Sequence, residues 1–262
     1  MNPLVVIPSR LAATRLPDKP LADIHGVPMI VHVWRRAVEA AIGPVVVACG
    51  DSAILAAIET AGGRAVLTDP DHPSASDRVW EAVERVDPAA RHDIIVNVQG
   101  DLPTLGGDFI RRILDPLRIE DQVDIATLVC PIADPTQDSG PSVVKAVVAW
   151  RPEGGIGRCL YFSRMNIPGG SGPLLHHIGL YGYRRDALAR FVALPPSPLE
   201  QREKLEQLRA LEAGMRIDVA LVDLLPTIGQ ECRRLRSRHQ CVSASNRARR
   251  APSSQSVLVS EA

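Results

Sequence analysis

The sequence predicts an α/β fold built on a doubly wound, mostly parallel sheet. Between residue 3 and about residue 130, short apolar runs alternate with segments whose apolar residues recur at helical spacing. The runs are rich in Val and Ile and show no polar alternation, which is typical of parallel strands covered on both faces. This alternation of strands and helices implies right-handed crossovers between parallel strands.

The elements of this first part follow from the runs themselves. Strands are predicted at residues 4–8, 45–50, 64–68, 93–98 and 124–130. Helices, each with a charged face, are predicted at residues 28–41, 52–63, 76–86 and 106–117. Pro28 suits the first turn of the first helix, and the Gly62–Gly63 pair suits the C-terminal end of the second.

The pattern changes after residue 130. Strands are predicted at 142–150 and at 176–188, the second running into a helix, with a Gly/Pro-rich loop at 166–173 between them. A last strand is predicted at 216–222.

An amphipathic helix is predicted at 197–214, with Ser197 as its N-cap, Pro198 at its start and Gly214 at its end. Beyond about residue 226 no periodic pattern remains. Residues 226–262 contain seven arginines, two glutamates and many serines, but no Asp or Lys. That composition predicts a disordered or poorly packed basic tail.

Bulk properties limit the classes of function. A chain of 262 residues can bury one sizeable core, and its formal net charge of zero argues against the basic surface of a nucleic-acid binder. The N-terminal residues show no signal-peptide pattern, and no apolar run is long enough to cross a bilayer. The five cysteines are scattered and odd in number, which favours buried thiols in a reducing compartment. We therefore expect a soluble cytoplasmic protein with no nucleic-acid or membrane partner.

The loop after the first strand, at residues 8–26, carries several cations and hydroxyls. They are Ser9, Arg10, Thr14, Arg15 and Lys19. In open α/β sheets ligands bind beyond the carboxyl ends of the strands, and such side chains suit a polyphosphate. The alternative is a solvated loop with incidental basic residues. The sequence has neither a P-loop nor a dinucleotide-binding glycine fingerprint, so the phosphates would be held in another way.

The segment NVQGDLP, at residues 97–103, follows the apolar run at 93–98 and puts Asp101 directly after a glycine. A carboxylate at the tip of a buried strand suits a site that holds a hard metal ion and a charged ligand. Taken alone, Asp101 could equally be a turn acid or an acid at a helix N-terminus.

Six segments occur in a consistent order over roughly residues 3–225. They read VVIPSRLAATRLPDKPLADIHGVPMIVHV, HPSASDRVWEAV, IIVNVQGDLP, LYFSRMNIP, HHIGLYGYRRDAL and PSPLEQREKLEQLRALEAGMRI. Together they closely resemble the 3-deoxy-manno-octulosonate cytidylyltransferases, also called CMP-Kdo synthetases. The resemblance implies a sheet of the nucleotide-diphospho-sugar transferase type in a domain at 1–225, with a smaller sugar-binding and dimerisation part at about 131–183.

The same resemblance implies a reaction. CTP and the eight-carbon acid sugar Kdo would give CMP-Kdo and diphosphate, in the cytoplasm, for lipopolysaccharide biosynthesis. The anomeric 2-hydroxyl of Kdo would attack the α-phosphorus of CTP in line, and catalysis would come from positioning and charge neutralisation. Mg²⁺ is the implied cofactor, and the chain is expected to form a homodimer.

The resemblance also implies roles for individual residues. Triphosphate binding and catalysis fall to Arg10, Arg15 and Lys19, together with Asp101 as the magnesium ligand, and Ser9 and Thr14 are further CTP contacts. The nucleoside contacts are Ser74, Ser76, Arg78 and Gln99. Gln99 would read the cytosine edge, for which an amide that both donates and accepts hydrogen bonds is suitable.

The sugar-acid pocket implied by the resemblance consists of Arg164, His177, Tyr181, Glu206 and Gln207. Arg164 is the expected partner of the Kdo carboxylate. Without the resemblance, Glu206 would be interpreted as part of the exposed polar face of a helix. His176 matches no family residue and is expected on the polar surface.

Some positions depart from the family pattern. Asp18 replaces a glycine and adds a negative charge near the expected phosphates, and Ala75 replaces a glycine whose backbone could need positive φ. The family's closing segment, with a second magnesium-binding aspartate, is absent. Glu231 falls at that position when the sequences are laid together without a gap, so it is the candidate second ligand.

Three alternatives to an active CMP-Kdo synthetase stay open. One is a catalytically impaired remnant that binds CTP but lacks the second metal ligand. Another is a cytidylyltransferase that acts on an amino-substituted Kdo analogue. The third is an oxidoreductase on a similar sheet, against which the missing G-x-G-x-x-G fingerprint argues.

Overall fold

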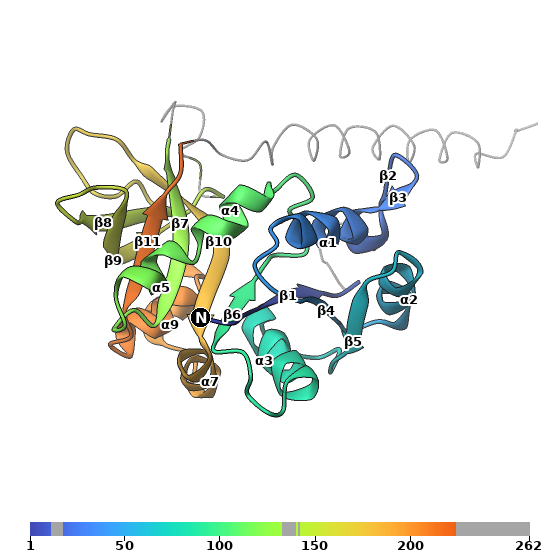
Figure 1. The fold of residues 1–262 in the computed structure, drawn as a ribbon. Coiled ribbons are helices and arrows are strands. Elements are labelled where there is room, and N and C mark those ends of the chain that lie inside the picture. The colour runs from blue at the N-terminus through green and yellow to red at the C-terminus, as the bar shows by residue number, and fades with distance from the viewer. Residues whose placement is uncertain (12–17, 133–139, 141, 224–262) are drawn as a thin grey trace, which may run out of the picture. The chain divides into compact units, whose positions relative to one another are not determined.

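A nine-stranded sheet runs through the computed structural model of the chain, in the order β5-β4-β1-β6-β10-β7-β11-β9-β8. The structure describes residues 1–11, 18–132, 140 and 142–223, all of which belong to the unit Met1–Pro226. Helices lie on both sides of the sheet (Figure 1). This architecture confirms the predicted α/β class.

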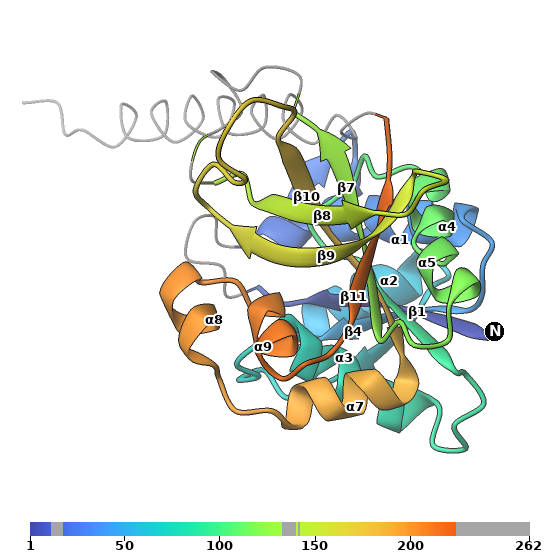
Figure 2. The same ribbon diagram turned by 90° about the vertical axis from the view of Figure 1, so that its left-hand side faces the viewer.

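The strands of the large sheet are β1 (Pro3–Ser9), β4 (Val45–Cys49), β5 (Arg64–Leu67), β6 (Ile94–Asn97), β7 (Ile125–Pro131), β8 (Lys145–Trp150), β9 (Ile156–Ser163), β10 (Leu175–Arg184) and β11 (Ile217–Leu221). β1 pairs in parallel with β4 and β6, β4 with β5, and β7 with β11. β10 runs antiparallel between β6 and β7, and β9 is antiparallel to both β11 and β8. Figure 2 shows β8 and β9 side by side at this end of the sheet. Parallel pairing is therefore confirmed for the first four predicted strands, while the part after residue 130 mixes both directions.

The helices are α1 (Met29–Glu39), α2 (Ser52–Thr60), α3 (Ala75–Val86), α4 (Gly107–Arg112), α5 (Asp115–Ile119), α7 (Arg185–Ala193), α8 (Pro198–Glu203) and α9 (Gln207–Glu212), with a 3-10 helix η1 (Lys19–Leu21). A two-stranded hairpin, β2 (Asp23–Ile24) and β3 (Val27–Pro28), precedes α1. α1 and α4 lie on one side of the sheet, and α3 and α7 lie on the other (Figure 1). Because helices cover both faces, every residue of β1 is buried, as its continuous apolar run predicts.

Two predicted helices are each broken in two. The helix predicted at 106–117 ends at Arg112 and resumes at Asp115, because Pro116 lacks an N–H and its ring excludes the carbonyl four residues earlier. The helix predicted at 197–214 is interrupted at Lys204, whose backbone is left-handed with φ 58° and ψ 46°. The N–H groups of Lys204 and Leu205 both bond to the Glu200 carbonyl, which is how helices end rather than continue.

Several predicted helix ends are confirmed. Ser197 caps α8 in a reciprocal capping box with Glu200, and Pro198 begins the helix. Gly214 follows α9 with φ 75°, and Gly62 follows α2 with φ 83°, as glycine stop signals require. Pro28, expected in the first turn of α1, is instead the N-cap residue directly before it.

β9 has no counterpart among the predicted strands. Its residues alternate between buried and exposed, with Cys159 buried and Leu160 exposed. Gly157 weakens the strand signal in the sequence, yet a side chain there would be impossible. A Cβ at this position would lie 2.6 Å from the Ala149 carbonyl oxygen of β8.

A buried carboxylate joins the end of α3 to the start of α7. Asp87 is 1% exposed, and its carboxylate accepts hydrogen bonds from the backbone N–H groups of Arg91 and His92. Arg185 Nη1 lies 2.7 Å from Asp87 Oδ2. Burial alone would raise the pKa of Asp87, but the His92 and Arg91 N–H groups hold it below its usual value. This anchor lies twelve residues along α3 from the helix start, and therefore roughly 18 Å away from it.

Among the described helices, none combines the length and the apolar character that spanning a membrane would require.

Candidate active site

The carboxyl ends of β1, β4 and β6 are held together by backbone contacts. The Gly50 N–H donates to the Ser9 carbonyl at 3.1 Å, which joins the end of β4 to the end of β1. Gly100, after β6, approaches β1 so closely that a Cβ there would lie 2.6 Å from the Pro8 carbonyl oxygen. The residues that follow these strands, predicted to hold a nucleotide, therefore lie at one edge of the sheet.

Lys19 and Asp101, which are far apart in the sequence, form an ion pair at this edge. Lys19 Nζ lies 2.7 Å from Asp101 Oδ2, and the two side chains are 28% and 55% exposed. Lys19 belongs to η1, whose N-cap Asp18 has φ 57°. The left-handed backbone explains why a glycine would suit position 18, and an aspartate tolerates it.

Arg10 reaches the segment that precedes α3. Its Nη1 donates to the His72 carbonyl at 3.4 Å. The His72 ring bonds in turn to Glu81 on α3, whose carboxylate also accepts the Asp69 N–H at 2.9 Å. Burial would raise the pKa of Glu81, but the Asp69 N–H and the His72 ring lower it, so the carboxylate is the stable form. Glu81 thus holds the loop that Arg10 contacts.

Arg78 is a buried cation, 2% exposed, beside the end of β4. It donates to Thr68 Oγ1 at 2.5 Å and to the Pro70 carbonyl at 3.1 Å. Burial lowers the pKa of Arg78, and the nearby positive charge of Arg10 lowers it further. Two cations this close create a site of positive potential that suits an anion.

Asp51 is a further candidate site residue, which the sequence pattern did not single out. Its Oδ2 accepts the Leu11 N–H at 2.8 Å, so it fixes the start of the cationic loop. It also opposes the effect of burial on Arg78 through its negative charge. The only signal for it in the sequence is its place directly after an apolar run and a glycine, as for Asp101.

Ser74 and Ser76 lie at the start of α3. Ser74 is the N-cap: its Oγ accepts the Asp77 N–H at 3.2 Å and donates to Asp77 Oδ2 at 2.7 Å. Ser76 is buried at 2% exposure. Ala75 lies within the helix and is absent from the residues with positive φ, so the lost glycine causes no strain there.

Gln99 is half-buried after β6 and lies beside Gly179, at the irregular part of β10 between Ile178 and Tyr181. Two buried polar atoms lie on the neighbouring strands: Ser9 Oγ and Asn97 Oδ1 have no hydrogen-bond partner within the described part of the chain. Orphaned buried polar atoms are uncommon in native proteins, and each marks a place where a ligand or water can bond.

Of the predicted sugar-pocket residues, Glu206 and Gln207 lie where α8 gives way to α9. Gln207 is 6% exposed, and the Glu206 side chain is 30% exposed, so Glu206 is half-buried and not on a fully exposed polar face. Glu206 Oε1 is buried, and Arg209 Nη2 lies 3.9 Å from it, an ion pair without a close hydrogen bond. Burial raises the pKa of Glu206, and the hydroxyls of Ser74 and Ser76 partly offset that rise. The start of α3 and the start of α9 therefore meet.

Arg164, at the end of β9, contacts the same junction. Its Nε donates to the Glu203 carbonyl at 3.0 Å, and its Nη2 donates to the Lys204 carbonyl at 3.2 Å. The guanidinium is thus anchored beside the residues that precede Glu206.

His177 and Tyr181 lie on β10, and their rings are in contact, with centroids 5.5 Å apart and planes inclined by 56°. His177 is 6% exposed, its Nε2 is hydrogen-bonded to Thr127 Oγ1 at 2.9 Å, and burial lowers its pKa to about 3. Tyr181 is half-buried, and burial raises the pKa of its phenol. Both rings are therefore neutral near pH 7, so they can donate or accept hydrogen bonds but supply no charge.

Three predicted site residues, Thr14, Arg15 and Glu231, lie outside the described residues. Within the described ranges no group of three or more His, Cys, Asp or Glu side chains could hold a metal ion by itself. Asp101 offers one exposed carboxylate, which fits magnesium, since that ion is commonly held by one or two carboxylates and by substrate phosphates.

The sequence of this chain is similar to those of cytidylyltransferases. A family model described as Cytidylyltransferase matches residues 4–217. A relative from Rhodospirillum centenum named 3-deoxy-manno-octulosonate cytidylyltransferase is 66% identical over 225 residues, 86% of this chain and 87% of that one. A relative of the same name from Paramagnetospirillum magneticum is 62% identical over 226 residues, 86% of this chain and 92% of that one.

The fold of this chain is also similar to solved structures of nucleotidyltransferases. A CMP:2-keto-3-deoxy-manno-octonic acid synthetase complexed with CTP is 36% identical, with a TM-score of 0.80, covering 94% of this chain and all 100% of that one. A nucleotidyl transferase from Methanothermobacter has a TM-score of 0.53 at 18% identity, covering 93% and 99% of the two chains. This second likeness concerns the fold alone.

Proposed function

This chain belongs to the cytidylyltransferase family, among the 3-deoxy-manno-octulosonate cytidylyltransferases, and we propose that it transfers the cytidylyl group of CTP to Kdo, releasing diphosphate. The observation that carries the proposal is the convergence of distant segments at one edge of the sheet. Lys19 meets Asp101, Arg10 meets the loop before α3, and Arg78 packs against the end of β4. Cations, a metal-binding carboxylate and a helix N-terminus together suit a nucleoside triphosphate.

The chain's residues act by binding and orienting. Arg10 and Lys19 would hold the phosphates and neutralise the charge that collects on the departing diphosphate. The Kdo 2-hydroxyl oxygen forms the new bond to the α-phosphorus as the bond from that phosphorus to the diphosphate oxygen breaks. Arg78 and the serines at the start of α3 would hold the nucleoside, and Gln99 would pair with the cytosine edge. No general base is assigned among the described residues.

Magnesium is the proposed cofactor. Asp101 would hold it from the protein side, and when bound it supplies positive charge to the α-phosphate and the diphosphate. Glu231, the candidate second ligand, lies outside the described residues, so Asp101 alone supports the proposal.

The sugar acid would lie between β10 and the α8–α9 junction. Glu206 Oε1 is buried, and its nearest cation, Arg209 Nη2, is 3.9 Å away, beyond hydrogen-bond distance, so this oxygen can accept a sugar hydroxyl. Kdo is preferred over an amino-substituted analogue because both curated relatives are named for it.

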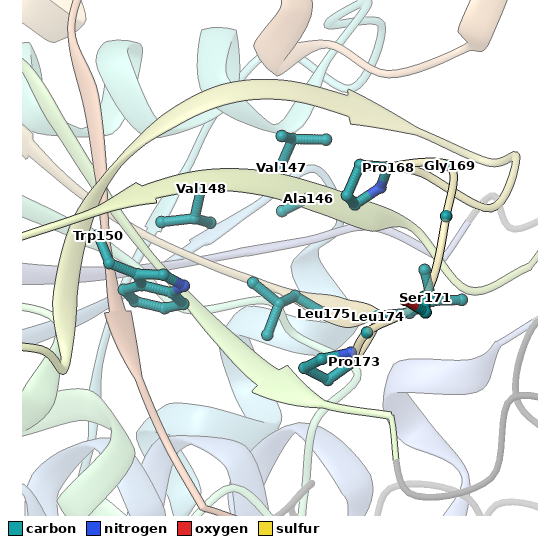
Figure 3. A pocket seen from close by; sticks show the side chains of 12 residues that line it. Ala146, Val147, Val148, Trp150, Pro168, Gly169, Ser171, Pro173, Leu174 and Leu175 are labelled. Atoms are coloured by element: carbon teal, nitrogen blue, oxygen red, sulfur yellow. The ribbon is translucent and has the colours of Figure 1, made fainter.

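We also propose a homodimer that forms through the β8 end of the sheet. Trp150, Leu160 and Met165 lie there at 40%, 53% and 71% exposure. A pocket of about 260 Å³ lies between β8, the loop at 168–174 and the start of β10. Trp150 lines one end of it (Figure 3). Exposed apolar side chains around a pocket at a sheet edge suit a partner subunit. Light scattering should give twice the monomer mass, and Trp150→Lys should give monomers; a monomeric wild type would contradict the dimer.

We also propose a cytoplasmic location, because of where the cysteines lie. The three described cysteines, Cys49, Cys130 and Cys159, are buried in the core, which suits a reducing compartment.

The deciding experiment measures diphosphate release from the full chain with CTP, Kdo and Mg²⁺. We expect release that requires all three components, and CMP-Kdo as the second product. Binding of CTP by calorimetry without any diphosphate release above background would overturn the proposal and favour the catalytically impaired remnant.

A further inference from the structure

We propose that Lys145 and Glu203 are positioning residues that fix Arg164 and the α8–α9 junction in the geometry that binds the sugar acid. The inference rests on the proposed function and concerns its sugar side only. Neither residue belongs to the sugar pocket predicted from the sequence.

Lys145 is a fully buried ammonium at the start of β8. Its Nζ donates to three backbone carbonyls: Gly140 at 3.1 Å, Val143 at 2.9 Å and Arg164 at 3.0 Å. In the sheet it lies opposite Ser163 of β9 and His176 of β10. The Lys145 ammonium therefore links the residues just before β8 to the backbone of Arg164, at the place where β8, β9 and β10 meet.

Glu203 holds the other side of the same backbone. Its Oε1 accepts the Ser163 hydroxyl at 2.8 Å, and its Oε2 accepts the Arg164 N–H at 3.2 Å. Arg164 returns the contact through Nε, which donates to the Glu203 carbonyl. The amide, the carbonyl and the guanidinium of Arg164 are thus fixed by separate partners, and bonds to charged groups are the stronger kind.

The α8–α9 junction connects the fixed position of Arg164 to the proposed sugar pocket. The left-handed backbone of Lys204 reverses the chain after α8, and Glu206 follows two residues later beside the serines of α3. Arg164 bonds to the carbonyls of Glu203 and Lys204, the residues just before Glu206. Lys145, Glu203 and Arg164 therefore form one rigid frame, and small positional errors in such frames are costly to a reaction.

The nucleotide side stands on different elements. Lys19 pairs with Asp101 after β6, and Arg78 on α3 bonds to Thr68 beside the end of β4, whereas Lys145 and Glu203 belong to β8 and α8. Loss of the frame should therefore weaken the binding of Kdo more than the binding of CTP. A general loss of stability would not produce that difference.

The test compares Lys145→Met and Glu203→Ala with two controls. Glu203→Gln keeps an oxygen for the Arg164 N–H, and the Ser163 hydroxyl can turn to accept from the new amide. Asp87→Asn disturbs a buried ion pair at the far end of α3, and so controls for lost stability.

In steady-state diphosphate release, Lys145→Met and Glu203→Ala should raise the KM for Kdo about tenfold or more, and that for CTP less than about twofold. Glu203→Gln should stay near wild type, and Asp87→Asn should lower the melting temperature without this split. Equal rises in both KM values, or a result indistinguishable from Asp87→Asn, would overturn the inference.

Amide hydrogen exchange gives a readout that needs no turnover. Exchange around 161–166 and 203–209 should accelerate in Lys145→Met and Glu203→Ala, while the segment at 75–86 keeps its wild-type rate. Unchanged exchange at both segments would refute the frame. A wild type that releases no diphosphate would refute the proposed function instead, so the two failures are distinguishable.

Discussion

The ammonium nitrogen of Lys19 lies 2.7 Å from Oδ2 of Asp101, so a cation expected to bind phosphate and a carboxylate expected to bind magnesium neutralise each other. Both side chains are partly exposed, and such pairs contribute little to stability. A magnesium-bearing nucleotide offers each group a stronger partner, phosphate oxygen for the ammonium and the metal for the carboxylate. The pair keeps both groups at the site in a form that the substrate can separate.

The first prediction concerns Asp101→Asn. It should lower kcat/KM about hundredfold or more at saturating magnesium, because the metal loses its carboxylate. Without magnesium, CTP should bind at least as tightly as to wild type, because a negative charge is gone and Lys19 is released. Calorimetry of CTP with and without Mg²⁺ measures both effects. Asp108→Asn, which removes an exposed carboxylate paired with Arg111, should change neither. Unchanged magnesium dependence in Asp101→Asn would refute the assignment.

A second prediction uses the close approach at Gly100. Gly100→Ala should destabilise the fold by about 1–3 kcal/mol, because its Cβ would lie 2.6 Å from a backbone oxygen that cannot move cheaply. Activity should fall as well, since Asp101 is the next residue. Gly169→Ala is the matched control: this glycine lies in an exposed loop, its Cβ would meet no atom within 4 Å, and the change should be close to neutral. Urea unfolding measures both; equal effects would contradict this account.

The third prediction is a pH dependence set by His177. Its folded pKa is about 3, against 6.5 for the free side chain, so the unfolded chain binds a proton that the folded chain excludes. The contribution of neutral His177 to the free energy of unfolding is complete above about pH 6.5. It is lost as the pH falls toward 3, by about 1.4 kcal/mol per pH unit. In His177→Gln that part of the stability loss at acid pH should vanish. Urea midpoints between pH 4.5 and 7 decide, and equal slopes in His177→Gln and wild type would be the contrary result.

The fourth prediction uses the left-handed Lys204. Lys204→Gly should stabilise the protein by about 0.5–1 kcal/mol, because glycine adopts φ 58° without the steric cost of a Cβ. Ala61→Gly, at the helical C-cap of α2 with φ −81°, should destabilise it by a similar amount. The two thermal melting shifts should therefore have opposite signs, and a loss of stability in Lys204→Gly would count against the backbone assignment.

The sequence predicts the parallel half of the fold well, because strands buried on both faces appear in the sequence as continuous apolar runs. β1 and β6 are buried throughout, and their residues are apolar except for Ser9 and Asn97 at the strand ends. β9 escapes prediction because one face is exposed and Gly157, required by the approach of Ala149, weakens the strand pattern. The break at Lys204 escapes because tertiary contacts from Arg164 favour it against a strong helical pattern.

For the site, chain position predicts which residues follow strands, but not how they pair. Asp101 stands out after its apolar run, yet its partner Lys19 is known only from the fold. Asp51 and Lys145 act through backbone groups, Leu11 N–H and three carbonyls, and such partners leave no trace in side-chain patterns.

The position of β11 in the sheet has a consequence for biosynthesis. This strand is the last of the described elements, yet it is inserted between β7 and β9. β8 also pairs with β10, at Lys145 and His176, but on the ribosome β9 can be joined to β7 only after residues 217–221 have emerged. Nascent chains stalled before residue 217 should expose that unfilled slot and bind holdase chaperones, whereas chains released beyond residue 223 should not.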